Sequence, residues 1–134
     1  FVDVGGWDTH VGQGSATGYL ASRFDELGRG LAALPQELGK AWKETTVVVM
    51  SEFGRTFRQN GSRGTDHGHG SVMWVMGGNV RGGRVVGEQV GVERSKLFQD
   101  RDFPGGMFQR QFGLSQTSIS TVFPGTRSKD LGLL

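Results

Sequence analysis

The chain is 134 residues long, with 24 glycines, no cysteine and a hydrophobic fraction of 35%. This length allows at most one domain, the glycines predict a loop-rich fold, and the missing cysteines exclude disulfide bonds and thiolate metal sites. The 15 Lys and Arg residues against 13 Asp and Glu give a net charge of +2, scattered along the chain, which argues against a nucleic-acid-binding protein. No segment approaches the roughly 20 apolar residues of a transmembrane helix.

Residues 1–4 are predicted to form a short strand, followed by a glycine-rich loop that carries Asp8 and His10. Because the sequence opens on a strand-like segment without an initiator methionine, we interpret it as a fragment or a processed product. An exposed sheet edge, where earlier strands would pair, would favour association into a homo-oligomer.

The next segment has the spacing of an amphipathic helix from Thr17 to Leu34. Its apolar residues recur at steps of four and three, and they are Leu20, Phe24, Leu27, Leu31 and Leu34. Pro35 is predicted to break or restart this helix, and a further turn then carries Leu38, Ala41 and Trp42.

Two further strands are predicted. The β-branched segment from Thr45 to Met50 is typical of a strand covered on both faces in a parallel sheet, so it completes a strand-helix-strand unit. The segment from Ser71 to Met76 predicts another strand, and glycines between Gly77 and Val90 indicate a hairpin. Short helices are predicted at residues 107–112 and 115–122.

Three loops carry the residue types of a metal site. The first holds Asp8 and His10, the second follows a strand and holds Glu52 and Arg55, and the third has the sequence Gly-Thr-Asp-His-Gly-His-Gly, with ligand candidates Asp66, His67 and His69. Loops at the carboxyl ends of parallel strands meet at one edge of the sheet, so we expect these side chains to converge. Imidazole and carboxylate together suit zinc, with manganese or iron as alternatives.

Each residue alone also has a structural interpretation. A single histidine is more often a hydrogen-bonded structural residue than a ligand. Glu52 is either a ligand, a residue that orients a ligand, or a capping or loop carboxylate. Arg55 is predicted to clamp an anion, because a guanidinium matches phosphate or sulfate oxygens, and its alternative is an ordinary surface arginine.

Three segments carry a specific resemblance: residues 5–10 (Gly-Gly-Trp-Asp-Thr-His), 47–56 (Val-Val-Val-Met-Ser-Glu-Phe-Gly-Arg-Thr) and 64–70. They resemble the carboxyl-terminal half of the domain of unknown function 1501 family, in the alkaline phosphatase and sulfatase superfamily. The resemblance implies an α/β sandwich with a mainly parallel sheet flanked by helices, of which residues 1–134 are the carboxyl-terminal part. It also implies export to the bacterial periplasm through a twin-arginine signal.

The resemblance further implies roles for individual residues. Asp66 and His67 match metal ligands and His69 a ligand or its partner, while Asp8 and His10 resemble the ligand pair of another metal at a shorter spacing. The implied function is a metal-dependent hydrolase of small anionic phosphate or sulfate esters. The alternative is a metal-binding or structural domain of an exported protein without catalysis. Neither Ser51 nor Thr65 is nominated as a nucleophile, because a hydroxyl needs a base or metal to activate it.

Overall fold

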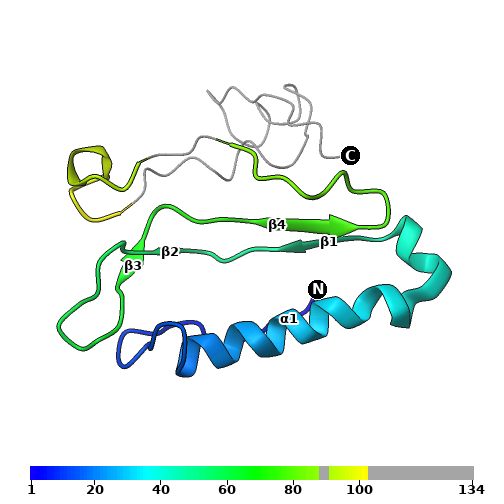
Figure 1. Cartoon of the computed structure of the whole chain (residues 1–134), viewed down its shortest axis with the longest axis horizontal. Helices are drawn as coiled ribbons and strands as arrows, with labels where there is room; N and C mark the ends of the chain where they lie inside the picture. The colour runs from blue at the N-terminus through cyan, green and yellow to red at the C-terminus, as the bar shows by residue number, and fades with distance from the viewer. Residues whose placement is uncertain (88–90, 103–134) are drawn as a thin grey trace.

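The computed structural model describes residues 1–87 and 91–102. Along the chain lie helix α1 (Tyr19–Leu38), the 3-10 helix η1 (Gly39–Glu44), strands β1 (Thr46–Val49), β2 (Gly54–Arg55), β3 (His67–Gly68) and β4 (Trp74–Gly77), and the 3-10 helix η2 (Arg94–Lys96). Figure 1 shows α1 running beside the β1–β4 pair, with β2 and β3 beyond one end of that pair. The helices predicted at 107–112 and 115–122 lie outside the described residues.

Helix α1 confirms the amphipathic segment but corrects its end. The helix continues through Pro35 to Leu38, so the predicted break at this proline is wrong. Proline removes only one backbone donor, and the helix needs just one more turn before Gly39, whose φ of 50° ends it. The N–H of Gly39 donates to the carbonyl of Pro35 and satisfies one of the last free acceptors of the helix.

Strand β1 confirms the β-branched strand, and its partner is β4. The two strands are antiparallel, with Thr46 opposite Gly77 and Val49 opposite Trp74. Strand β2 pairs with β3, also antiparallel, with Gly54 opposite Gly68 and Arg55 opposite His67. Both pairs of named strands in the described part of the chain are thus antiparallel, and the mainly parallel sheet stays a prediction.

Two other predicted elements differ from the structure. Residues 1–4 form no strand with any described segment, and Phe1 and Val2 are almost fully exposed, so the hydrogen bonds that would define a strand are missing there. The hairpin predicted between Gly77 and Val90 has no strand over residues 78–87, and residues 88–90 are not described.

The interior around the loops is polar. Among the described residues only Leu97 is a buried hydrophobic side chain, whereas the buried polar side chains are Thr9, Thr56, Thr65 and Asp102. Helix α1 contacts its surroundings through aromatic rings, because Phe24 lies 5.1 Å from Trp7 and 6.1 Å from Trp74 between ring centroids. No helix over the described ranges is long and apolar enough to cross a membrane.

Candidate metal centre

Backbone hydrogen bonds join the first loop to residues 62–65, where the third loop begins. Gly12 N–H donates to the carbonyl of Ser62 at 3.0 Å, and Thr65 N–H donates to the carbonyl of Thr9 at 3.1 Å. An isolated bridge between Val11 and Arg63 extends this pairing. The aspartate and histidine of the first loop are thereby fixed against the third loop, although more than 50 residues separate them in sequence.

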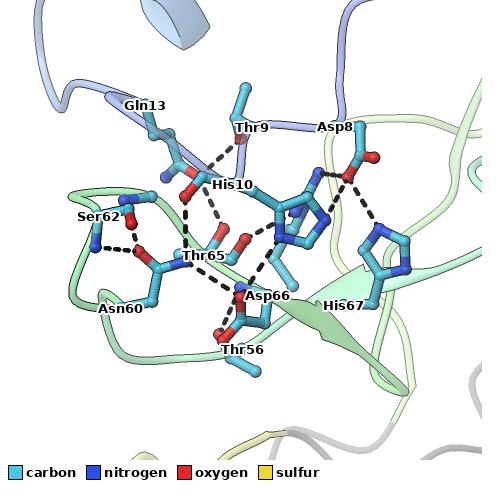
Figure 2. A network of polar contacts seen from close by, with 12 residues as sticks. Asp8, Thr9, His10, Gln13, Thr56, Asn60, Ser62, Thr65, Asp66 and His67 are labelled. Carbon is cyan, nitrogen blue, oxygen red and sulfur yellow. Dashed lines mark hydrogen bonds and ion pairs between the residues drawn. The ribbon is translucent and has the colours of Figure 1, made fainter.

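Asp8 is the centre of the site. Its Oδ1 atom lies 2.9 Å from His10 Nε2 and 2.8 Å from His67 Nε2. One ligand atom from each of these three residues lies within 4.8 Å of the other two, which is close enough to surround a single metal ion. Figure 2 shows the two imidazole rings turned toward the Asp8 carboxylate from different loops.

The cluster is accessible and favours a charged carboxylate. The side chains of Asp8, His10 and His67 are about half exposed. Hydrogen bonding from His67, with further contributions from Arg55 and from the nearby histidines, holds the pKa of Asp8 below its ordinary value despite some desolvation. Asp8 is therefore available at neutral pH as an anionic oxygen ligand.

Asp66 contacts the second ring nitrogen of His10, Nδ1. Its Oδ1 atom lies 3.3 Å from His10 Nδ1, so the two ring nitrogens of His10 face two different carboxylates. A hydrogen bond from Asn60, followed by that from His10, lowers the pKa of Asp66. When Nε2 of His10 serves as a ligand atom, the ring proton lies on Nδ1, where the charged Asp66 carboxylate accepts it in a hydrogen bond.

His67 is held by aromatic packing. Its ring stacks on Phe53 at 3.9 Å with an interplanar angle of 12°, and it lies 4.8 Å from the ring of His10. Because Phe53 directly precedes β2, which pairs with β3, the short strand pair brings this aromatic ring under His67. The packing limits rotation of a side chain that is otherwise half exposed.

His69 takes a separate position and does not join the three-residue cluster. Its Nδ1 atom lies 2.8 Å from Asp102 Oδ2, its backbone N–H donates to the same oxygen at 2.6 Å, and Gly70 N–H donates to Asp102 Oδ1 at 3.1 Å. The Asp102 side chain is only 1% exposed. Burial alone would raise its pKa, but these hydrogen bonds outweigh it and the pKa lies below its ordinary value.

Comparison with protein families places the chain. The family model described as "Protein of unknown function (DUF1501)" matches residues 1–118. The chain belongs to this family. The searches among curated proteins and among solved structures returned no match.

In this DUF1501 chain, the guanidinium of Arg55 is hydrogen-bonded to groups of the protein itself. Its Nη2 donates to Asp8 Oδ1 at 2.6 Å and to the carbonyl of Trp7 at 2.8 Å, and its Nη1 donates to the carbonyl of Thr65 at 2.7 Å. Arg55 thus ties the first loop to the third. Glu52 is exposed and has no hydrogen bond or ion pair to any part of the chain that the structure describes.

Two site residues of this DUF1501 member were missed from sequence. Asp102 lies in a segment without a clear pattern, and an acidic residue 33 positions after His69 carries no signal of contact. Asn60 lies in a glycine-rich tip where an asparagine is expected for turn formation alone. Only the folded arrangement shows that Asn60 and Asp102 form hydrogen bonds with residues of the predicted ligand loops.

Proposed function

We propose that the chain binds a divalent metal ion through Asp8, His10 and His67, and that this centre serves a hydrolase of phosphate or sulfate esters. The observation that carries the proposal is the convergence of two imidazole nitrogens, from distant loops, on one carboxylate oxygen. Structural packing alone does not require two half-exposed histidines to meet at one oxygen.

The donor set fits zinc best. Two imidazole nitrogens and one carboxylate oxygen are three ligands of the kind found in catalytic zinc sites, where a fourth position stays open for water or substrate. The contact between Asp66 and His10 Nδ1 is the carboxylate-histidine arrangement that orients metal ligands elsewhere. Manganese and iron accept the same donors and are the alternatives.

The proposed chemistry divides between the ion and the chain. A bound divalent ion would supply Lewis acidity toward an ester oxygen and toward water. The residues of the chain hold it: Asp8 brings the negative charge, and Arg55 fixes that carboxylate while keeping one positive charge beside the site. The substrate class and an exported, periplasmic location rest on the resemblance to the alkaline phosphatase and sulfatase superfamily. Contact of Arg55 with a substrate anion stays a prediction, as do a role for Glu52 and assembly into a homo-oligomer.

A second candidate is a metal-binding or structural domain without catalysis. One specific observation favours it: the guanidinium of Arg55, the residue expected to clamp an anion, is already engaged by Asp8 and two backbone carbonyls. In this case the ion would join the loops and no ester would turn over.

The deciding experiment measures metal content and hydrolysis on the same samples. The chain is dialysed against zinc, manganese or iron(II), the bound metal is counted, and release of nitrophenol from nitrophenyl phosphate and sulfate is followed. We expect near-stoichiometric zinc, and turnover that Asp8→Asn abolishes together with binding. Metal binding without turnover favours the non-catalytic metal-binding candidate. No bound metal in the wild type contradicts the metal site and leaves only a structural domain.

A further inference from the structure

The side-chain amide of Asn60 uses its whole hydrogen-bonding capacity. Its Nδ2 donates to Asp66 Oδ1 and to the carbonyl of His10, both at 3.0 Å, and its Oδ1 accepts from the backbone N–H groups of Ser62 at 2.9 Å and Gly64 at 3.0 Å. An asparagine amide has two donor hydrogens and one acceptor oxygen, so all are engaged. Figure 2 shows this amide between Ser62 and Asp66.

These contacts fix the orientation of the amide. A flipped amide would turn its oxygen toward a carboxylate and a carbonyl, and its N–H groups toward two backbone N–H groups. All four contacts would then be repulsive, which leaves one orientation. The side chain is also half-buried, which limits competition from water.

The two halves of the amide do different things. The oxygen closes the turn at residues 60–64, as asparagine commonly does in loops. The nitrogen instead reaches two groups that contact or belong to His10: the carboxylate that faces His10 Nδ1, and the backbone carbonyl of His10 itself. Turn formation needs only the oxygen half.

We propose that Asn60 is a positioning residue of the metal centre, which holds Asp66 and the backbone of His10 in the register that directs His10 Nε2 toward Asp8 and His67. This inference rests on the proposed metal site. The chain of contacts runs from Asn60 Nδ2 to Asp66 Oδ1, from that oxygen to His10 Nδ1, and across the ring to Nε2, which lies 2.9 Å from Asp8.

The variant Asn60→Asp separates the two halves. It keeps an oxygen to accept from Ser62 and Gly64, but it replaces the donor nitrogen with an oxygen that faces Asp66. Gln59→Glu is the matched control, because it makes the same amide-to-carboxylate change one position earlier, on an exposed side chain without a hydrogen bond or ion pair to the described residues.

The test has two readouts on the full chain. Nitrogen-15 NMR of the metal-free protein at a fixed pH reports which His10 ring nitrogens carry a proton. Competition with a chromogenic chelator gives the zinc affinity. We expect the wild-type protonation pattern of His10 in Gln59→Glu and a changed pattern in Asn60→Asp. We also expect zinc binding to be weakened about 10- to 100-fold in Asn60→Asp, as for other partners of metal ligands.

The outcomes separate the two proposals. If the wild type binds zinc and Asn60→Asp matches Gln59→Glu in tautomer and affinity, the positioning role is wrong while the metal site stands. If the wild type binds no zinc, the metal site is wrong, and the NMR readout alone decides whether Asn60 sets the His10 tautomer. Should Asn60→Asp fail to fold, Asp66→Asn replaces it: this variant keeps Asn60 and its turn, and an unchanged His10 tautomer there overturns the inference.

Discussion

His67 Nε2 lies 2.8 Å from Asp8 Oδ1, although 59 positions separate the two residues in sequence. The contact depends on loops that are joined by backbone hydrogen bonds, and it brings the two motifs most suggestive of metal chemistry into one site.

His67 and His69 offer a matched pair for metal binding. The two residues belong to one motif, but only His67 lies in the cluster with Asp8 and His10. We expect His67→Ala to lose bound zinc and His69→Ala to keep it. Elemental analysis after dialysis measures this difference, and an equal loss in both variants would show that the motif binds metal as a unit.

Arg55 is expected to stabilise the fold whether or not metal is bound. Arg55→Ala removes two charged hydrogen bonds to backbone carbonyls, so we expect a loss of about 1.5–3 kcal/mol in the free energy of unfolding. Urea denaturation followed by circular dichroism measures the loss.

Arg29→Ala is the control for this change. Arg29 pairs with Asp25 on α1, and both side chains are mostly exposed. A surface pair of this kind contributes about 0.3–0.5 kcal/mol. Comparable losses in the two variants would contradict a tying role for Arg55.

Gly64 is required by the close approach of the first and third loops. A Cβ atom at this position would collide with the backbone of His10 and Thr9, whereas one at Gly61 would meet nothing. We expect Gly64→Ala to separate the loops, to destabilise the protein by about 1–3 kcal/mol and to weaken zinc binding. Gly61→Ala should change neither quantity. Thermal melts and zinc titration of the two variants provide the check, and a Gly64→Ala variant with wild-type affinity would show that the centre does not need this contact.

Asp102 should make the free energy of unfolding depend on pH in the acidic range. Its pKa in the folded chain lies below the ordinary value of 3.8, so its contribution is complete above that value and is lost as the pH falls through the lower, folded-state pKa. We expect the free energy of unfolding to decline below about pH 4, and Asp102→Asn to flatten this decline. Asp100→Asn, on an exposed neighbour, is the control. Parallel pH profiles for wild type and Asp102→Asn would refute the assignment.

Helix α1 and strand β1 could be predicted because their patterns are local. Apolar spacing sets the helix, and a run of β-branched residues sets the strand, whichever segment later pairs with it. The partner of the strand could not be predicted in the same way. Strand β1 pairs with β4 in antiparallel register, and this pairing depends on the path of the segment between them, not on either strand alone. The break predicted at Pro35 was wrong for a similar reason, because continuation of the helix depends on the turn that follows this proline.

The candidate site was predictable in its residue types and less so in its geometry. Asp8, His10 and His67 stand out by chemistry and do meet, whereas His69 has equal chemical promise and turns to Asp102 instead. Sequence spacing cannot distinguish these two histidines, because the difference arises from Asp102, which lies 33 positions after His69 in sequence. The contacts of Arg55 were hidden for the same reason: two of its three acceptors are backbone carbonyls, which every residue carries.

The pairing of Val49 with Trp74 makes the intervening segment a closed excursion whose two ends are fixed side by side. Residues near the tip of this segment also bond to the first loop, because Ser62 and Arg63 pair with Gly12 and Val11. A change in length at that tip would leave Arg55 opposite His67, because β2 and β3 lie between the tip and the closing pair. It would, however, shift Asn60 and Ser62 away from their partners in the first loop. The length of the tip is thus coupled to the position of the loop that carries Asp8 and His10.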